Sequence, residues 1–209
     1  SNSLIAKIYR NYVEGGYELV ITGIGAMADY SYYSDTSAPW YSYSSNITRV
    51  EFSDGITTIG SYAFYYCTAL REVTIPQSVE KMSWDSFAYA DKLVVIFEDD
   101  KLPSMTGETW AFVSAYYLSP RKVVLAEDAT YVIDAEGNAC LAKYIGNATT
   151  FVAWTDVDSI SITQIGEYAF YNRSNLRTYW IHEGISYIGR NAFSNCGGLA
   201  LLMESDELP

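Results

Sequence analysis

The sequence has little of what most catalytic and metal sites require. Its 209 residues include one histidine, His182, and three cysteines, Cys67, Cys140 and Cys196, none of them in a Cys-x-x-Cys pair. An odd number of cysteines without that spacing argues against a disulfide framework and against a zinc site. A Ser-His-Asp or Cys-His catalytic site would need His182 as its base. We therefore predict no catalytic residues, no bound cofactor or metal, and a protein that is not an enzyme.

Positive charge and long apolar runs are also scarce. The 13 lysines and arginines face 25 aspartates and glutamates, which gives a net charge of -12. Such a surface repels phosphate backbones, so we expect no nucleic-acid partner. The longest apolar stretches, such as residues 93–97, are far shorter than the roughly 18 residues of a membrane helix, and no transmembrane segment is predicted. With 49% hydrophobic residues, the chain can still bury one core or two small ones.

The sequence does contain a repeat. Apolar residues recur at a spacing of 23, as in Ile59/Met82, Phe64/Phe87, Ile165/Ile188, Phe170/Phe193 and Leu176/Leu199. A longer period of 106 residues is superimposed on it, because 16 of the residues at 57–103 are identical to those at 163–209. Two levels of self-similarity indicate a short structural unit repeated within a module that was itself duplicated.

One repeat has the form Leu-x-x-Val-x-Ile-Pro followed by Val-x-x-Ile-Gly-x-x-Ala-Phe. The first half predicts a short strand whose first, fourth and sixth residues point inward, and the second half predicts a return segment. A single unit cannot bury its own apolar face, whereas stacked units can, which predicts a β-rich solenoid with strands in parallel ladders about 4.8 Å apart. Gly60, Gly166 and Gly189 follow the inward Ile, where we expect a positive φ or a close backbone approach.

The segment Ile59-Gly-Ser-Tyr-Ala-Phe-Tyr-Tyr-Cys67, followed by Leu70-Arg-Glu-Val-Thr-Ile-Pro76, resembles the BspA-like leucine-rich-repeat family, whose repeat also has 23 residues. Residues 19–27 and 37–40 are similar to the segment that introduces such repeats in bacterial surface proteins. The resemblance implies a leucine-rich-repeat solenoid with turn or short-helical return segments. It also implies a secreted or cell-surface protein of a host-associated bacterium, or less often a parasitic protist. Adhesion to a host or extracellular-matrix protein is the implied role, and the family brings no catalytic motif.

The repeat pattern predicts four parts of the chain. Residues 1–46 form an N-terminal capping strand and an aromatic loop, 47–120 a first leucine-rich-repeat block, 121–147 a β-hairpin connector and 148–209 a second block. The hairpin should turn at residues 136–138, where Glu-Gly-Asn lies between alternating strand formers. Pro103 is followed by a return segment, whereas the equivalent Pro209 ends the sequence, so we expect the second block to be cut short.

Side chains at the third, fifth and seventh strand positions should point away from the core and form the sheet face, the usual recognition surface of solenoids. The candidate ligand-binding residues on this face are Phe97, Thr178, Trp180, His182 and Met203. At a spacing of 23, Trp180 and Met203 should touch and form an exposed apolar anchor. The alternative is that the connector or a further coil covers them. Glu98 and Glu204 depart from the pattern, because they occupy sixth positions that should be apolar.

A second candidate site is the aromatic loop at residues 29–46. Its rings are Tyr30, Tyr32, Tyr33, Trp40, Tyr41 and Tyr43, of which Tyr32, Tyr33, Trp40 and Tyr41 are the candidate ligand-binding residues. If exposed, they would stack on a sugar or on another protein, and if buried, they would cap the first coil. Three functions therefore stay open. We favour protein binding through the sheet face; the alternatives are a carbohydrate-binding module and a structural stalk that spaces another domain from the cell.

Overall fold

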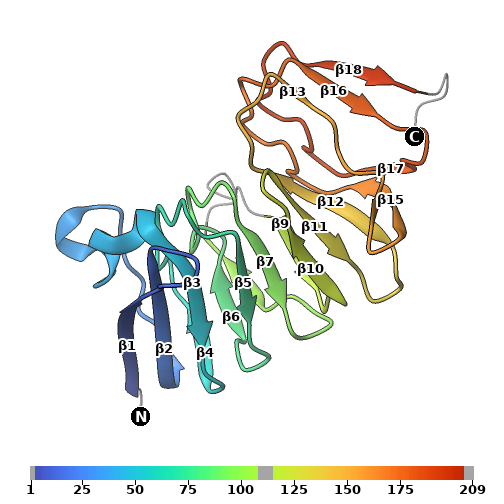
Figure 1. Ribbon diagram of the computed structural model, residues 1–209. Coiled ribbons are helices and arrows are strands. Elements are labelled where there is room, and N and C mark those ends of the chain that lie inside the picture. Colours follow the sequence, from blue (N-terminus) through green and yellow to red (C-terminus); the bar gives the residue numbers. More distant parts are fainter. Residues whose placement is uncertain (1–2, 108–114, 205–209) are drawn as a thin grey trace. The chain divides into compact units, whose positions relative to one another are not determined.

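The computed structural model describes residues 3–107 and 115–204, which divide into two compact units, 1–119 and 120–209 (Figure 1). Short strands make up nearly all of the regular structure in both units. The helical elements in the described ranges are two 3-10 turns, Ser34–Thr36 and Tyr41–Asn46. Neither is long or apolar enough to cross a membrane.

The described part of unit 1 consists of nine strands in two ladders. They are β1 (Ser3–Arg10), β2 (Tyr17–Ala26), β3 (Ile47–Phe52), β4 (Ile56–Ile59), β5 (Glu72–Ile75), β6 (Lys81–Ser83), β7 (Val94–Phe97), β8 (Ser104–Thr106) and β9 (Ala115–Leu118). One sheet has the order β1-β2-β4-β6-β8, with β3 on β2, and the other has the order β5-β7-β9. Every pairing is parallel except that of β1 with β2. These ladders confirm the predicted β-rich solenoid, and Figure 1 shows its successive coils side by side.

A third side of each coil, the turn side, is a tight turn segment that follows the inward apolar residue. In unit 1 the turn side comprises residues 60–69 and 83–92. Backbone hydrogen bonds join the two segments: the N–H of Phe64 donates to the carbonyl of Ser86 (2.7 Å) and that of Tyr66 to the carbonyl of Ala88 (2.9 Å). Stacking of the turns therefore fixes the spacing of the side chains on this side as firmly as a ladder does on the strand sides.

The core of unit 1 is the apolar stack that the 23-residue spacing predicts. Ile59 pairs with Met82 along the β4–β6 ladder, and both are fully buried. The rings of Phe64 and Phe87 stack with centroids 4.8 Å apart and planes 13° apart. A Cβ added to Gly60 would lie 2.0 Å from a backbone carbonyl oxygen of the preceding coil, so a close backbone approach explains this glycine.

Unit 2 repeats the plan with a hairpin at its start. Its strands are β10 (Lys122–Leu125), β11 (Ala129–Ile133), β12 (Ala139–Tyr144), β13 (Thr150–Phe151), β14 (Asp156–Val157), β15 (Ile160–Ile165), β16 (Thr178–Ile181), β17 (Tyr187–Ile188) and β18 (Ala200–Met203). One sheet has the order β10-β11-β12-β15-β14, with β17 on β15, and the other β13-β16-β18. Antiparallel β11 and β12 turn through Gly137 (φ +89°), which confirms the predicted hairpin. The turn side comprises residues 166–175 and 189–198, where Phe170 and Phe193 stack at 4.9 Å.

The period slips by one residue at two places on the sheet face. The ladders pair Ile75 with Phe97 and Ile181 with Met203, an offset of 22 rather than 23. Because side chains alternate between the two faces of a strand, a slip of one residue moves every later side chain to the other face. The side-chain directions predicted from a strict 23-residue count are therefore reversed in β7 and β18.

This slip corrects two predicted orientations and explains two irregularities. Phe97 is 2% exposed and belongs to the core of unit 1, so its predicted outward orientation is wrong. Met203 packs against the core of unit 2 instead of lying on the outward face. Glu98 and Glu204 come directly after β7 and β18 and are exposed. They take the seventh position of the repeat rather than the sixth, and a polar side chain fits there.

Candidate functional site

On the sheet face of unit 2, Trp180 and Thr178 keep their predicted strand positions in β16. The Trp180 side chain is 43% exposed, and Thr178 is half-buried. The register neighbour of Trp180 in β18 is Leu202, so the predicted pairing with Met203 is wrong. The sheet face of this unit therefore presents one large exposed ring in place of the expected two-residue anchor.

His182 follows β16 directly and is half-buried rather than exposed. Its Nδ1 accepts a hydrogen bond from the backbone N–H of Gly184 at 3.3 Å, and its Nε2 is buried without a hydrogen-bond partner among the described residues. A catalytic histidine needs a hydroxyl or thiol within hydrogen-bond reach. The ring has a structural contact with the turn that follows and no such partner in the described part of the chain.

The aromatic loop is partly a cap and partly a surface. Trp40 is 4% exposed; its Nε1 donates to the carbonyl of Ala63 at 2.7 Å, and its ring stacks on Phe64 at 5.9 Å. Trp40 therefore covers the core, which corrects its place among the ligand-binding candidates. Tyr32 and Tyr33 are 48% and 65% exposed, so these two rings do lie at the surface.

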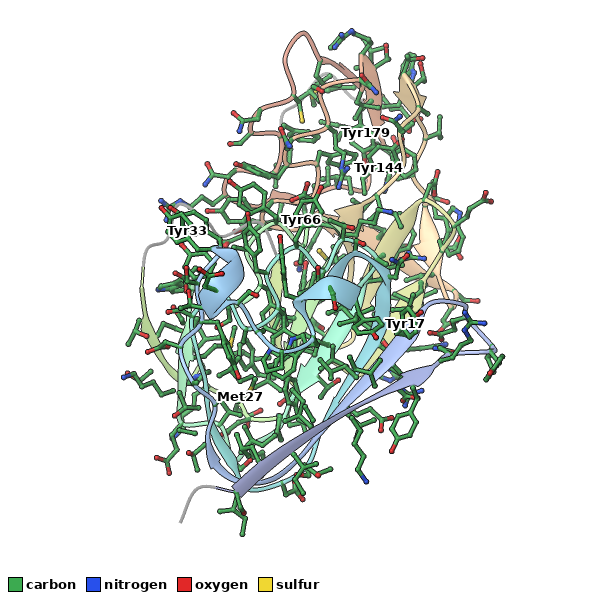
Figure 2. All side chains as sticks on the ribbon, turned by 90° about the vertical axis from the view of Figure 1, so that its left-hand side faces the viewer. Tyr17, Met27, Tyr33, Tyr66, Tyr144 and Tyr179 are labelled. Carbon is green, nitrogen blue, oxygen red and sulfur yellow. The ribbon has the colours of Figure 1, made fainter. Side chains whose placement is uncertain are left out.

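The exposed rings of the loop join a larger group on the turn side of unit 1. We call this group the tyrosine surface: Tyr32, Tyr33, Tyr41, Tyr62, Tyr65, Tyr66 and Tyr89. Tyr65 lies at its centre, with its ring centroid 5.5 to 6.3 Å from those of its tyrosine neighbours. Figure 2 shows Tyr33 at the left of the view and Tyr17 beside the strands at the right. The loop and two successive coils thus contribute to one continuous cluster of rings.

Three members of the tyrosine surface have a left-handed backbone conformation. The angle φ is +52° at Tyr62, +62° at Tyr66 and +64° at Tyr89. For most L-residues this conformation costs about 1–2 kcal/mol. The positions 106 residues after Tyr66 and Tyr89 hold Asn172 (φ +61°) and Asn195 (φ +60°), and asparagine tolerates this conformation better. The turn itself therefore does not require tyrosine, and strain kept at surface residues points to a use for their side chains.

Their surroundings raise the pKa of three hydroxyl groups of the tyrosine surface, those of Tyr32, Tyr62 and Tyr65. Burial is the main cause that raises the pKa of Tyr62, and the second cause is the hydrogen-bonded carboxylate of Asp85. Burial and the neighbouring tyrosine hydroxyls raise the pKa of Tyr65. The hydroxyl of Tyr32 donates to that of Tyr33 at 2.9 Å, and this bond raises the pKa of Tyr32. The surface therefore offers ring faces and hydroxyl groups beside the buried carboxylate of Asp85.

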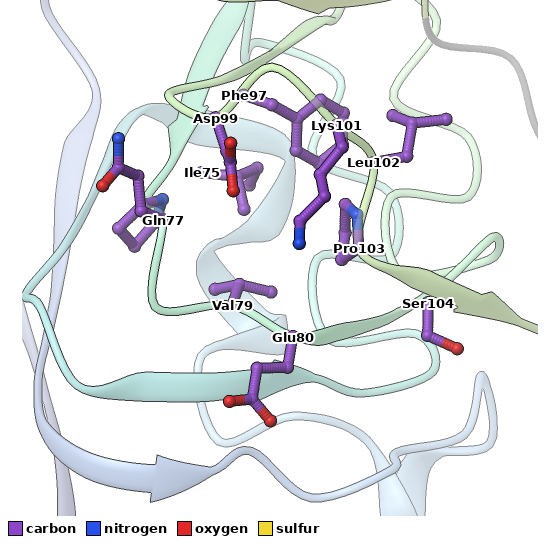
Figure 3. A pocket seen from close by; sticks show the side chains of 11 residues that line it. Ile75, Gln77, Val79, Glu80, Phe97, Asp99, Lys101, Leu102, Pro103 and Ser104 are labelled. Carbon is purple, nitrogen blue, oxygen red and sulfur yellow. The ribbon is translucent and has the colours of Figure 1, made fainter.

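Unit 1 also contains a pocket of about 380 Å3 at the ends of β5 and β7 (Figure 3). Its lining residues are Ile75, Pro76, Gln77, Val79, Glu80, Phe97, Asp99, Lys101, Leu102, Pro103 and Ser104. Core side chains, among them Phe97, form its apolar part, and Glu80, Asp99 and Lys101 add charges of both signs. The volume falls in the range of small-molecule sites. The lining contains neither histidine nor cysteine, so it lacks the usual nucleophile and base pair.

Metal-ligating side chains are not gathered in the described ranges. Residues 3–107 and 115–204 contain no group of three or more histidine, cysteine, aspartate or glutamate side chains suited to a metal ion. No disulfide links the three cysteines. Burial raises the pKa of Cys67 to about 12 and also raises the pKa of Cys196. Reactive cysteines have lowered pKa values, so these two thiols have structural roles.

Comparison with known proteins places the repeats in a family. A sequence model of the BspA type leucine rich repeat region matches residues 36–118 and 149–205 in six copies, which is more than half of the chain. The chain belongs to the BspA-type leucine-rich repeat family. No curated protein sequence matches this BspA-type chain.

Three solved bacterial structures are similar to this BspA-type protein. A leucine-rich repeat protein from Eubacterium ventriosum has 17% identity and a TM-score of 0.35, over 98% of this chain and 73% of that chain. A leucine rich cell surface protein from Faecalibacterium prausnitzii has 16% identity and a TM-score of 0.38, over 98% and 77%. The pneumococcal vaccine antigen PcpA has 13% identity and a TM-score of 0.40, over 97% and 69%.

Sequence reasoning missed four members of the tyrosine surface: Tyr62, Tyr65, Tyr66 and Tyr89. The BspA-type repeat identifies the inward apolar positions, but it does not say which turn residues meet across coils. A signal was present nonetheless. Tyr66 and Tyr89 are 23 residues apart, and each follows a core phenylalanine by two positions. Coils that stack in this period must bring the two tyrosines to the same side.

Proposed function

We propose that this BspA-type protein is a non-enzymatic recognition module of the cell surface or extracellular space that binds a protein partner through the tyrosine surface. The observation that supports the site is the retention of Tyr66 and Tyr89 at left-handed positions where unit 2 has asparagine. Tyrosine is enriched in interfaces, because its ring buries a large area and its hydroxyl still forms hydrogen bonds. Adhesion to a host or extracellular-matrix protein is the role that the family resemblance favours.

The sheet face supports this function less well than the tyrosine surface. Its predicted anchors are reduced to Trp180, because Phe97 and Met203 pack inward. On the sheet face of unit 1, Arg49 forms an ion pair with Glu18 at 3.2 Å, and pairs of this exposed kind contribute little. Binding energy concentrates where several large side chains cluster. A group of contacting rings therefore fits a recognition site better than one isolated ring.

The test is binding of the purified chain to an array of immobilised host matrix proteins, mucins and glycans. The variant Tyr66→Asn/Tyr89→Asn copies the residues of unit 2 and should weaken a protein hit at least about tenfold. Tyr12→Asn is the matched control, because Tyr12 is 87% exposed on the β1–β2 hairpin and lies outside the tyrosine surface. This control and Trp180→Ala should both leave binding unchanged.

Other patterns on the array would contradict the proposal. A protein hit that survives the double substitution but disappears in Trp180→Ala would move the site to the sheet face. A blank array for the folded chain would favour the stalk role. Circular dichroism of each variant shows whether a lost hit reflects binding or folding.

Carbohydrate binding is the second candidate, and the exposure of Tyr32 and Tyr33 favours it. Their rings lie 4.3 Å apart and their hydroxyls are hydrogen-bonded, so this pair offers both aromatic and polar contacts to a sugar. Glycan hits without protein hits, lost in Tyr32→Ala/Tyr33→Ala, would replace the protein partner with a carbohydrate. Glycan hits that persist in this variant would argue against that site.

A further inference from the structure

We infer that the tyrosine surface takes a basic polypeptide segment, whose arginine or lysine side chains lie over its rings. The inference rests on the proposed function and specifies the partner of the same surface. Four features support it: the charge of the segments that form the surface, the geometry of the rings, the electrostatics around Tyr62 and Tyr65, and the contrast with the turn side of unit 2.

The segments that form the tyrosine surface are acidic. Residues 29–46, 60–69 and 83–92 contain four carboxylates and a single basic residue: Asp29, Asp35, Asp85, Asp91 and Lys92. An excess of negative charge attracts cationic partners, repels anionic ones and speeds association with a basic segment. Among the chemical classes of partner, a basic segment is therefore the complement of this surface.

Three of the seven ring contacts in the tyrosine surface are edge to face and leave ring faces open, whereas the other four are tilted at 32° to 39°. Tyr65 and Tyr89 meet edge to face, with centroids 5.5 Å apart and planes 77° apart. Tyr62 meets Tyr65 at 72° and Tyr32 at 68°. An edge-to-face contact covers one face of one ring and only the edge of the other, whereas stacking hides a face of each. A cation binds over a ring face within about 6 Å of the centroid, and Tyr66 and Tyr89 are 48% and 49% exposed.

The groups that shift the pKa values of Tyr62 and Tyr65 are Asp85 and other tyrosines, and no basic side chain of the described residues is among them. The pKa of Tyr62 is raised by burial, by Asp85 and by other tyrosines, and that of Tyr65 by burial and other tyrosines. A cation beside these hydroxyls would lower their pKa instead. The rings and the Asp85 carboxylate thus form a negative environment that an incoming guanidinium or ammonium group would complement.

The same turns in unit 2 have the opposite charge. Residues 166–175 and 189–198 contain two arginines, Arg173 and Arg190, and one carboxylate, Glu167. These segments also hold asparagine at the positions of Tyr66 and Tyr89. Unit 2 keeps two tyrosine rings on this side, Tyr168 and Tyr171, which meet edge to face with centroids 5.8 Å apart, but it lacks the rings at the positions of Tyr66 and Tyr89 and the net negative charge. Since the backbone requires neither, their joint presence in unit 1 fits a ligand that uses both.

The inference is tested on the full chain with short peptides that alternate glycine with arginine, lysine or glutamine. Calorimetric titration should show binding of the arginine peptide, weaker binding of the lysine peptide and none of the glutamine peptide, because a guanidinium also stacks on rings. Raising the salt concentration from about 0.05 M to about 0.5 M should lower the affinity for the arginine peptide at least about tenfold. Binding of the glutamine peptide with equal affinity would overturn the inference.

Matched variants separate ring faces from net charge. Tyr66→Asn/Tyr89→Asn should lower the affinity for the arginine peptide at least about tenfold. The affinity of Tyr66→Phe/Tyr89→Phe should stay within about twofold of that of the parent, because this variant keeps the rings. Tyr12→Asn should change nothing. Equal binding by the asparagine pair would mean that net charge alone attracts the peptide, and loss in the phenylalanine pair would mean that hydroxyls form the contact. Either result overturns the inference.

Competition distinguishes this inference from the proposed function. If an array partner depends on Tyr66 and Tyr89 but the arginine peptide does not displace it, the basic segment is wrong and the protein-binding site stands. If neither the partner nor the peptide depends on these tyrosines, both are wrong. Displacement of the peptide by a glycan at the same tyrosines would assign the surface to a carbohydrate.

Discussion

On the turn side of both units, the residue two positions after each stacked phenylalanine has a left-handed backbone, and in the first of the two stacked turns its N–H donates a hydrogen bond to the next coil. In unit 1 the N–H of Tyr66 donates to the carbonyl of Ala88 at 2.9 Å, and in unit 2 the N–H of Asn172 donates to that of Ser194 at 3.0 Å. The stack of coils therefore determines the backbone at this position, while the side chain is free to differ. Tyrosine there has a conformational cost that asparagine largely avoids.

The described tyrosines of unit 2 include three that are fully buried, beside the partly or largely exposed Tyr168, Tyr171 and Tyr187, whereas those of unit 1 include no fully buried one. In unit 2, Tyr131, Tyr144 and Tyr179 are at most 1% exposed and fill the core. In unit 1, every tyrosine whose side chain is described is partly or largely exposed. The residue 106 positions before Tyr179 is Val73, a buried aliphatic side chain. The comparison predicts that substitutions of the exposed tyrosines of unit 1 act on binding and that substitutions of the three buried tyrosines of unit 2 act on stability.

The largest expected effect concerns two tryptophans, one in each unit. Trp40→Ala should lower the free energy of unfolding of unit 1 by about 3–5 kcal/mol, because it removes a buried ring and leaves the carbonyl of Ala63 without its donor. Trp180→Ala removes a ring that is 43% exposed and should cost unit 2 less than about 1 kcal/mol. Native-state hydrogen exchange reports each unit separately. If Trp40→Ala lowers the free energy of unfolding as little as is expected for Trp180→Ala, Trp40 is not a core residue.

Exchanging the left-handed residues should have the next largest effect. Asn172→Tyr/Asn195→Tyr should lower the free energy of unfolding of unit 2 by about 2–4 kcal/mol in total, because each of the two tyrosines acquires the strained conformation. The reverse exchange, Tyr66→Asn/Tyr89→Asn, should change unit 1 by less than about 1 kcal/mol, since relief of strain offsets the lost ring contacts with Tyr65. Hydrogen exchange or urea unfolding measures both.

The control for this exchange is Asn172→Gly, which removes the side chain without adding strain and should leave unit 2 within about 0.5 kcal/mol of the parent. If the variant Asn172→Tyr/Asn195→Tyr is as stable as the parent protein, the left-handed positions do not discriminate between asparagine and tyrosine. The tyrosines of unit 1 would then need no functional explanation.

The sequence predicted the solenoid, its period of 23 and the hairpin, because inward apolar positions and turn residues are periodic and local. It failed on the sheet face for a physical reason. All four residues of β7, Val94–Phe97, and all four of β18, Ala200–Met203, are apolar, so no polar residue marks which face is outward and a slip of one residue leaves no trace. Trp40 was misplaced and the tyrosine surface incompletely predicted because packing between a loop and the turns of later coils has no sequence period.

A smaller effect tests the tyrosines in the core of unit 2. The hydroxyl of Tyr179 is buried and has no hydrogen-bond partner among the described residues. Tyr179→Phe should therefore raise the free energy of unfolding by about 1 kcal/mol, because it removes an unsatisfied polar group. Tyr131→Phe is the contrasting control: its hydroxyl accepts the N–H of Trp154 at 3.2 Å, so the same change should cost about 1 kcal/mol. A loss in both variants would mean that Tyr179 has a partner.

The smallest effect appears only in alkali. Burial raises the pKa of Tyr131 from 10.0 to about 12 and raises that of Tyr179 further, so in the folded protein both keep their protons where unfolded tyrosine ionises. The unfolded chain then binds fewer protons than the folded one, and stability that is present below pH 10.0 is lost as the pH rises through that range. Tyr179→Phe should move the alkaline unfolding midpoint upward by a fraction of a pH unit, measured by circular dichroism beside tyrosinate absorbance. In unit 1 the corresponding group is the Cys67 thiol, because burial raises its pKa from 9.0 to about 12. Cys67→Ala should therefore reduce the loss of stability of unit 1 in alkali, and this effect should begin at a lower pH than the effect of Tyr179→Phe in unit 2. A Tyr179→Phe midpoint equal to that of the parent would mean that this hydroxyl ionises before unit 2 unfolds and is not buried as the core requires.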